Sequence, residues 1–419
     1  MNVKDTLLAA KEASTRCATA SEELRNNALS AMADALRDEV DRILEANKAD
    51  MADARKAGMK DSLLDRLMLD GNRVFDIADA LEELSDLPDP LGQVQDERTI
   101  AGGVQMQRIS TPMGVVAMVY EARPNVTADA AGICVKSGNA CVLRGGSAAH
   151  RSNLAIAGVL HEAAVRAGMP QNCILAVEDA ERSATDELLR ARGLVDLLIP
   201  RGGAGLISHC VEYATVPVIE TGVGNCHLYV HDPADVAMAT EIAVNAKCQR
   251  PGVCNAIETL LVDRSIARKA LSSILPALFR NGVQYFHTDP ISSEIASDLQ
   301  IPAIVSTEED WAREYLELEI AVKCVEGLDE AIAHVNTFGT KHSESIVTDD
   351  AQAAERFLSE VDAAAVYWNA STRFTDGGQF GLGAEIGIST QKLHARGPFA
   401  LEALCSYKYV LRGSGQVRA

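Results

Sequence analysis

Two cysteines are the residues of this sequence whose type and spacing most directly suggest chemistry. Cys248 and Cys254 lie on either side of Gln-Arg-Pro-Gly in the stretch NAKCQRPGVCNAIETLLV. Such residues could supply a nucleophile, could bind a metal, or could simply be small buried side chains. The ten cysteines include no Cys-x-x-Cys pair, and no histidine pair lies nearby at metal-ligand spacing. Metal binding is therefore the weakest of the three interpretations, and no metal site is expected.

Cys254 is the better candidate for a catalytic thiol. A nucleophilic thiol must be accessible and ionisable, which favours a loop at a cleft. Pro251 and Gly252 are expected to end a helix near Lys247, and AIETLLV then predicts a strand, so Cys254 lies where a loop meets a strand. Cys248 falls in the last helical turn and is expected to be packed. From these residues alone, a buried structural role for Cys254 remains open.

Asn125 and Glu220 could complete such a site. Asn125 follows a predicted strand in ARPNVT, where Pro124 restricts the backbone. An amide donor held there could stabilise a tetrahedral oxyanion, a contribution of typically ~3–4 kcal/mol. Asn125 could equally form a turn or begin a helix. Glu220 ends another predicted strand in VIETG, where its carboxylate could act on a substrate or simply be solvated.

The middle of the chain alternates short apolar runs with helical stretches. The runs lie at residues 114–120, 140–146, 173–179, 195–200 and 216–222. Such alternation predicts a parallel β-sheet with helices on both faces. Because ligands bind at the carboxyl ends of such strands, the turns YEARPN, RGGS, IPRGG and ETGVG are expected to lie at a ligand-binding edge.

The rest of the chain predicts a helical start, a second lobe and a projecting element. Residues 3 to about 85 show the apolar spacing of helices, with a predicted N-cap at Ser21. A second alternating series, from IETLLVD to AAAVYWNAS, predicts another α/β lobe. ERTIAGGVQMQRISTPMG predicts a β-hairpin. The extended tail LCSYKYVLRGSGQVRA is expected to pair with the hairpin near 96–113 or with another subunit.

Composition excludes several classes of partner. The 419 residues are 47% hydrophobic, which is enough for two or three lobes. A formal net charge of -20 argues against nucleic-acid binding. No apolar run approaches the ~20 residues of a membrane helix. The start of the chain is amphipathic and unlike a signal peptide, so a cytoplasmic location without membrane association is expected.

Several motifs together resemble one enzyme superfamily. They are PMGVVAMVYEARPNVT, SGNACVLRGGS, IPRGG, VIETGVGNCH, AKCQRPGVCNAIETLLV and VEGLDEAIAHVNTFGTKHSESI, and they cover most of residues 110 to 390. Through them the chain resembles the aldehyde dehydrogenase superfamily and, through RPGVCNA and HSES, its gamma-glutamyl phosphate reductase family. The resemblance implies an α/β fold with three parts. These are a Rossmann-type cofactor domain (1–95 and 115–222), a catalytic α/β domain (223–398) and a small β oligomerisation element (96–114 and 399–419).

The resemblance implies catalytic roles for three residues. Cys254 is the implied nucleophile, and Asn125 together with the Cys254 backbone N–H is the implied oxyanion hole. Glu220 precedes Cys254 at the spacing that the superfamily shows for its general base. Because an acyl-phosphate reductase needs no water to release its product, Glu220 is expected to orient or tune the site.

The resemblance also implies a nucleotide site. Arg144 stands where superfamily members usually carry a lysine that reaches the adenosine ribose, and its planar fork suits a 2′-phosphate. Ser147 stands where some NAD-specific relatives carry glutamate, so both residues favour NADP(H). The glycine turns alone are weak signals. The implied cofactor-binding residues are Arg144, Gly145, Gly146, Ser147, Pro200, Arg201, Gly202, Gly203, Thr221, Gly222 and Glu314, the last at the nicotinamide ribose.

The implied reaction is the NADPH-dependent reduction of L-glutamyl 5-phosphate to L-glutamate 5-semialdehyde and phosphate through a cysteine thioester, the second step of proline biosynthesis from glutamate. Arg123, Arg373, His342 and Ser343 are candidates to bind the substrate. A dimer or tetramer is expected, and the upstream glutamate 5-kinase is a possible partner. Rival interpretations are a hydrolytic aldehyde dehydrogenase with Glu220 as base, a thiol hydrolase, and a non-catalytic binding protein.

Overall fold

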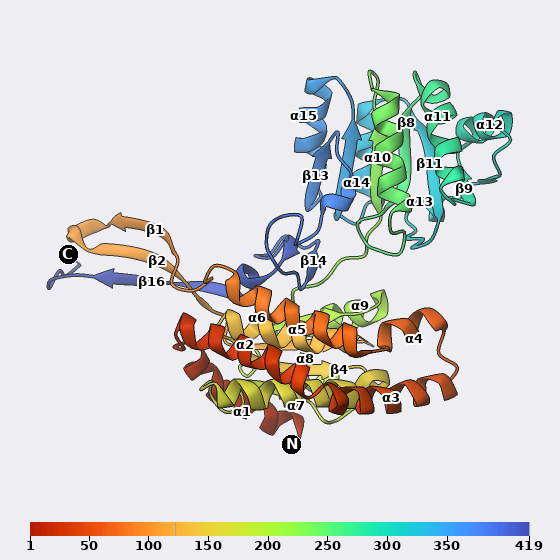
Figure 1. Ribbon diagram of the computed structural model, residues 1–419. Helices are drawn as coiled ribbons and strands as arrows, with labels where there is room; N and C mark the ends of the chain where they lie inside the picture. The colour runs from red at the N-terminus through yellow and green to blue at the C-terminus, as the bar shows by residue number, and fades with distance from the viewer. Residues whose placement is uncertain (122, 419) are drawn as a thin grey trace. The chain divides into compact units, whose positions relative to one another are not determined.

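The chain folds into two compact units. The computed structural model describes residues 1–121 and 123–418, apart from the side chains of residues 62 and 204. Unit 1 comprises Met1–Glu220 with Phe399–Ala419, and unit 2 comprises Thr221–Pro398 (Figure 1). The change of unit after Glu220 lies close to the domain boundary expected after residue 222. The functions assigned to these domains from the sequence remain predictions.

Unit 1 begins with amphipathic helices, in agreement with the apolar spacing of its sequence. Ser21 caps the second helix as predicted, because its hydroxyl accepts a hydrogen bond from the Leu24 N–H at 3.2 Å. The helices are α1 (Val3–Cys17), α2 (Glu22–Asp38), α3 (Val40–Lys56), α4 (Asp61–Leu67) and α5 (Gly71–Asp86).

A parallel sheet forms the centre of unit 1. Its strand order among the described residues is β5-β4-β3-β6. Every residue of β3 is buried, as expected for a parallel strand with helices on both faces (Figure 1). The strands are β3 (Val115–Tyr120), β4 (Ala140–Gly145), β5 (Ile174–Ala176) and β6 (Leu197–Arg201). The helices that follow them are α6 (Asn125–Lys136), α7 (His150–Arg166), α8 (Arg182–Leu189) and α9 (Ala204–Tyr213), with the 3-10 turn η2 (Ser147–Ala149) before α7.

The expected strand at residues 216–222 is wrong. This segment forms only an isolated bridge between Leu198 and Val218. Leu198 donates to the Pro217 carbonyl at 2.8 Å and accepts from the Ile219 N–H at 3.0 Å. Because Pro217 has no N–H, it cannot extend the ladder as a donor. The apolar pattern of VPVIETG therefore reflects burial of Val216 and Ile219 without a regular strand.

The predicted hairpin and the chain's tail form an extended three-stranded sheet (Figure 1). β1 (Val94–Thr99) pairs with β2 (Gln105–Pro112), which in turn pairs antiparallel with β16 (Cys405–Arg412) from the tail. The expectation that the tail pairs with the hairpin is thereby confirmed. The 3-10 turn η1 (Ala101–Gly103) joins β1 to β2, and η4 (Leu401–Leu404) precedes β16.

Unit 2 contains a second, larger parallel sheet. Its order within the described ranges is β10-β9-β11-β8-β7-β12-β13, and β14 and β15 form a separate pair. The strands are β7 (Cys226–Val230), β8 (Ile257–Asp263), β9 (Tyr285–Thr288), β10 (Ala303–Val305), β11 (Glu319–Val325), β12 (Ser343–Val347), β13 (Ala365–Trp368), β14 (Gly387–Ser389) and β15 (Gly397–Phe399). The helices are α10 (Val236–Cys248), α11 (Ala267–Arg280), α12 (Pro290–Asp298), α13 (Glu308–Trp311), α14 (Leu328–Phe338) and α15 (Ala351–Glu360), with the 3-10 turn η3 (Thr372–Phe374).

Alternation along the central strands buries both faces of this sheet. In β8, Leu260 and Val262 pack in the cluster that includes residues of α10, α11 and α12. Leu261 packs on the opposite face, in the cluster that includes residues of α14 and α15. This double burial makes the sheet a rigid base for the loops at its strand ends. Within the described ranges, every helix is too short or too polar to span a bilayer.

Candidate active site

Cys254 lies on the loop between α10 and β8, as the sequence predicts. The loop occupies residues 249–256, and a turn within it is closed by the Ala256 N–H, which donates to the Val253 carbonyl at 3.1 Å. Cys254 is half-buried. Pro251 and Gly252 come shortly after Gln249, the C-cap of α10, so the helix cannot continue into the loop. Cys254 therefore has the partial exposure that a reactive thiol requires.

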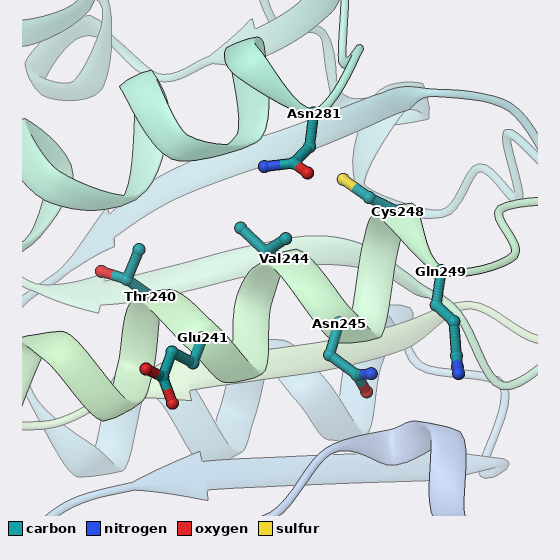
Figure 2. A pocket seen from close by; sticks show the side chains of 7 residues that line it. All are labelled: Thr240, Glu241, Val244, Asn245, Cys248, Gln249 and Asn281. Carbon is teal, nitrogen blue, oxygen red and sulfur yellow. The ribbon is translucent and has the colours of Figure 1, made fainter.

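Cys248 ends α10 and lines a shallow groove on the surface of unit 2. The groove runs beside α10 and reaches Asn281 after α11 (Figure 2). Burial raises the pKa of the Cys248 thiol, and its side chain packs partly against the core. These features suit a packed thiol better than a nucleophile, although Cys248 is not fully buried. Among the described residues, no group of three or more His, Cys, Asp or Glu side chains is arranged to hold a metal ion.

The backbone of Cys254 is fixed by two residues that the sequence did not single out. The Cys226 thiol donates to the Cys254 carbonyl at 3.2 Å. Gly224 lies against the same carbonyl so closely that a Cβ at position 224 would stand 1.7 Å from its oxygen. Both residues belong to VIETGVGNCH, so the motif pointed to this segment without revealing the contact. They hold the loop that carries Cys254 (the Cys254 loop) in place.

A methyl group at Gly224 should displace the Cys254 loop. We expect Gly224→Ala to lower kcat by roughly 10²-fold, because a misplacement of about 1 Å at a reacting atom can cost that much. Steady-state kinetics with a melting curve measures this effect. Gly205→Ala is the matched control, since a Cβ at that position meets no atom within 4 Å. Equal kcat for both variants would contradict the positioning role of Gly224.

Asn255, the residue after Cys254, joins the loop to the segment around η3. Its buried amide donates to the Thr375 carbonyl at 2.9 Å, and its own carbonyl accepts from the Thr372 hydroxyl at 2.7 Å. Its Oδ1 accepts from the guanidinium of Arg373, which also donates through Nε to Gln249 Oε1 at 3.0 Å. Arg373 thus contacts residues on both sides of Cys254 in the sequence. Its charge also interacts with the Cys254 thiol.

A fully buried ion pair spans the two ends of the same loop. Lys247, in the last turn of α10, bonds Glu258 at the start of β8, and neither side chain is exposed to solvent. Glu258 also accepts from the Leu316 N–H at 3.2 Å. Burial raises the pKa of Glu258 to about 7. Because each charge is out of water, each needs the other, and the pair ties the end of α10 to the start of β8.

Glu314 lies beside this ion pair. One of its carboxylate oxygens accepts from the Gly224 N–H at 2.6 Å, next to the contact between Gly224 and Cys254. Burial raises the pKa of Glu314, and the charge of Lys247 opposes that shift. This oxygen therefore supports the Cys254 loop. The expected contact with a nicotinamide ribose stays a prediction.

His342 and Ser343 lie inside unit 2, and both are fully buried. His342 Nδ1 bonds the Ser343 hydroxyl at 2.8 Å, and that hydroxyl bonds Thr375 Oγ1 at 2.6 Å. Burial lowers the pKa of His342 to about 4, so this residue is neutral near pH 7. Both residues are joined through Thr375 to Asn255 and hence to the Cys254 loop, and their expected role as substrate donors stays a prediction.

The glycine turns of unit 1 gather at one edge of its sheet, as predicted. Gly145 pairs with Tyr120, and Tyr120 pairs with Arg201, so the carboxyl ends of β4, β3 and β6 coincide. Gly202 and Gly203 then lead into α9, with Gly203 as its N-cap. The Gly203 N–H donates to the carboxylate of Glu121 at 3.1 Å. An anionic side chain at the start of α9 shows that this turn can accept negative charge, as a nucleotide phosphate requires.

Glycine is required at two of these positions by close approach. A Cβ at Gly145 would stand 1.9 Å from Asn153 Nδ2, and one at Gly202 would stand 2.7 Å from Cδ of Glu121. Gly146, which follows Gly145, lies against the backbone of Glu121. The turns are therefore packed tightly around Glu121. The Glu121 carboxylate therefore occupies the backbone donor of Gly203 at this edge.

Arg144 is more tightly anchored than the sequence suggests. Its guanidinium is largely buried and donates to the carbonyls of Ala180 and Glu181 at 2.8 and 3.0 Å. Burial lowers its pKa, the nearby charge of Asp179 opposes that shift, and the charge of Arg182 adds to it. Ser147 opens η2 and is exposed. The charges around Arg144 are therefore mixed, with the cation of Arg182 and the carboxylate of Asp179 both near its guanidinium.

The remaining predicted residues are divided between the two units. Asn125 is the first residue of α6, is exposed, and donates to Asp129 Oδ2 at 3.1 Å. Arg123 is exposed two residues earlier, and Pro200 is buried within β6. Glu220 ends the first segment of unit 1. Thr221 and Gly222 begin unit 2, where the Gly222 N–H donates to the Ile388 carbonyl at 3.0 Å.

Comparisons with known proteins identify the family of this chain. The model of the aldehyde dehydrogenase family matches residues 1–284. A gamma-glutamyl phosphate reductase of Caldanaerobacter subterraneus subsp. tengcongensis is 51% identical over 98% of this chain and 98% of its own length. One from Moorella thermoacetica is 53% identical over 98% and 97% of the two chains.

A solved structure is similar to this chain in both sequence and fold. The crystal structure of gamma-glutamyl phosphate reductase from Thermotoga maritima superposes with a TM-score of 0.97 and 44% identity, and it covers 100% of both chains. An acetylating aldehyde dehydrogenase from Geobacillus thermoglucosidasius, at 21% identity and a TM-score of 0.67, shares the fold. The chain therefore belongs to the aldehyde dehydrogenase family, within the branch of the gamma-glutamyl phosphate reductases.

Proposed function

We propose that this protein reduces L-glutamyl 5-phosphate to L-glutamate 5-semialdehyde and phosphate with NADPH, in the second step of proline biosynthesis from glutamate. The observation that carries the proposal is the half-buried thiol of Cys254 on a loop fixed from several sides. Relatives that are about half identical to this chain over nearly its whole length bear the name of that reductase. The chemistry of the loop suits covalent catalysis by a cysteine thiolate.

The proposed reaction begins at the sulfur of Cys254. The thiolate attacks the acyl carbon, a C–S bond forms, and the C–O bond to phosphate breaks as phosphate leaves with the electron pair. The product of this step is a thioester on Cys254. Bound NADPH supplies the hydride that reduces the thioester carbon. The C–S bond then breaks, the thiolate leaves, and the aldehyde is released, so the thiol is regenerated for the next turnover.

Two further residues have proposed roles in this scheme. The Asn125 amide and the Cys254 backbone N–H are proposed to stabilise the oxyanion of each tetrahedral intermediate. Asn125 is suited to this role because it is exposed at the start of α6, where the helix dipole also favours negative charge. Glu220 is proposed to orient the site, because phosphate release leaves no deacylating water to activate.

The preference for NADP(H) over NAD(H) is supported by the charges beside β4. Ser147 presents no carboxylate that would repel a 2′-phosphate, and Arg144 and Arg182 supply two cations, which offset the carboxylate of Asp179 beside them. The strand-end turns of Gly145, Gly202 and their neighbours would hold the nucleotide in unit 1.

A coupled assay tests the function. We expect NADP to be reduced in the presence of glutamate 5-semialdehyde and inorganic phosphate, with NAD a poorer acceptor. Omission of phosphate should stop the reaction, since phosphate must release the acyl group from Cys254. Turnover at the same rate without phosphate would instead support a hydrolytic aldehyde dehydrogenase.

Assembly into a dimer or tetramer through the three-stranded sheet is also proposed. Tyr407, Tyr409 and Leu411 alternate along β16 and are each about half exposed, at 51%, 50% and 53%. A strand face with three large apolar side chains is suited to contact with another chain. Light scattering measures the assembly. Association with a glutamate 5-kinase, which would pass on a labile acyl phosphate, is a further proposal.

A further inference from the structure

Two arginines lie beside Cys254, in a chain whose net charge is -20. Arg373 lies in η3, and Arg250 lies in the Cys254 loop itself. Throughout residues 1–121 and 123–418, neither forms an ion pair with a carboxylate. Arg250 and Arg373 lie close enough for each charge to disfavour the other, while Asp376 offsets this only in part. Two cations held together in this way favour an anion between them.

The guanidinium of Arg373 is oriented without being neutralised. Gln249 Oε1 accepts from its Nε at 3.0 Å, and Asn255 Oδ1 accepts from one of its terminal nitrogens. Both acceptors are neutral amides, so the full positive charge is retained. A guanidinium carries five N–H donors in a planar fork, and these two bonds leave donors on the terminal nitrogens for an oxyanion. Asn255 is itself buried and bonded to Thr372 and Thr375, which makes the arrangement rigid.

The position of this fork matches the geometry of an acyl phosphate. In such a substrate the leaving oxygen is bonded directly to the carbon that the thiolate attacks. Any group that binds the phosphate must therefore lie next to the nucleophilic sulfur. Arg373 meets this requirement, since it bonds residues on both sides of Cys254 in the sequence and its charge interacts with the thiol. An α-carboxylate, at the far end of a glutamyl chain, would lie well away from the sulfur.

We infer that Arg373, oriented by Gln249 and Asn255 and accompanied by Arg250, forms the site for the phosphate group that leaves during thioester formation and attacks in the reverse direction. The inference rests on the proposed function for the identity of the reaction. The site itself is an anion site for a dianionic phosphate next to a thiol. Gln249 and Asn255 are positioning residues, and they act through Arg373.

Inorganic phosphate is the probe that tests the site without turnover. Iodoacetamide labelling of Cys254, followed by peptide mass spectrometry, is measured across a phosphate titration. Phosphate bound at Arg373 should shield Cys254 in a saturable way. Cys248, six positions earlier at the end of α10, is the internal control, and its labelling should not depend on phosphate. Absence of saturable protection at Cys254 in the wild-type protein would overturn the inference.

Variants of the two arginines locate the bound phosphate. Arg373→Met should raise the half-protecting phosphate concentration by at least about tenfold, the loss expected for a charge-assisted hydrogen bond. Arg373→Lys should recover part of that loss, because the charge returns without the fork. Arg250→Met should cause a smaller increase. Arg356→Met, which removes an exposed cation elsewhere in unit 2, should leave the titration unchanged.

A conservative variant and the phosphate KM keep the test decisive. If Arg373→Met does not fold, as judged by its melting curve, Gln249→Leu should still raise the half-protecting concentration by misorienting the guanidinium. In the oxidative assay, Arg373→Met should raise the KM for phosphate and leave the KM for NADP unchanged. An unaltered half-protecting concentration in folded Arg373→Met and Arg250→Met would sink the inference while the reductase function stood. Protection without any reductase turnover would sink the function and leave the phosphate site.

Discussion

Cys254→Ala should lose turnover by roughly 10³-fold or more, while its melting curve stays close to that of the wild-type protein. The expected loss is large because no other thiol can replace it. Cys226 is fully buried, and burial raises its pKa well above the ordinary value, so it does not supply a thiolate near neutral pH. Cys248 is only partly exposed, and its pKa is also raised. The measurement is NADP reduction with semialdehyde and phosphate, together with thermal unfolding.

The matched control for this experiment is Cys248→Ala. Cys248→Ala removes the same sulfur atom as Cys254→Ala, but six positions earlier, at the end of α10. This variant should keep most of the activity. Mass spectrometry should detect an acylated Cys254 in the wild-type protein when the semialdehyde and NADP are supplied without phosphate. Near-normal turnover in folded Cys254→Ala would refute covalent catalysis at this residue.

Lys247→Met should destabilise the protein by about 3–5 kcal/mol, the usual loss when one partner of a buried ion pair is removed. The variant leaves Glu258 without its cation in a site that water does not reach. Since α10 and β8 flank the Cys254 loop, kcat should fall as well. Urea unfolding measures the free energy of unfolding. If the two units unfold separately, the unfolding curve will show a second transition.

The destabilisation should depend on pH in a defined direction. Burial already raises the pKa of Glu258 to about 7, above its ordinary value of 4.5. Loss of the Lys247 cation removes a cause that lowers this pKa, so the pKa rises further in the folded variant. At a pH between the ordinary pKa of Glu258 and its raised pKa in the folded variant, the folded state holds a proton that the unfolded chain releases. The stability of Lys247→Met should therefore rise as pH falls from about 8 to about 5, and its gap to the wild-type protein should narrow as pH falls toward about 7.

A double variant separates the unpaired charge from the lost packing. Lys247→Met with Glu258→Gln removes both charges and keeps an oxygen that can accept the Leu316 N–H. It should recover much of the stability lost in Lys247→Met, because no charge is left buried. Equal destabilisation in the single and double variants, without dependence on pH, would show that packing and not charge is responsible.

The sequence predicted the architecture well where its signals are local. Strand–helix alternation indicated both parallel sheets, and the hairpin with its paired tail followed from extended β-forming segments. The strand predicted at residues 216–222 is absent, although the apolar run there resembles one. Burial of Val216 and Ile219 produced the pattern, and Pro217 prevented a regular ladder. Periodicity reports burial directly and hydrogen bonding only indirectly, which explains this error.

The candidate site divides in the same way. The amino-acid sequence by itself determined the residue types: a cysteine after Pro-Gly-Val, glycine turns after strands, and an arginine at Arg144. Only the tertiary structure decided what surrounds them. It placed Gly224 against the Cys254 carbonyl, buried His342 and Ser343, and joined Arg373 to Asn255, more than a hundred positions earlier in the chain. The physical reason is that contacts across strand ends depend on the register of a folded sheet, and no short-range pattern in a single sequence records that register.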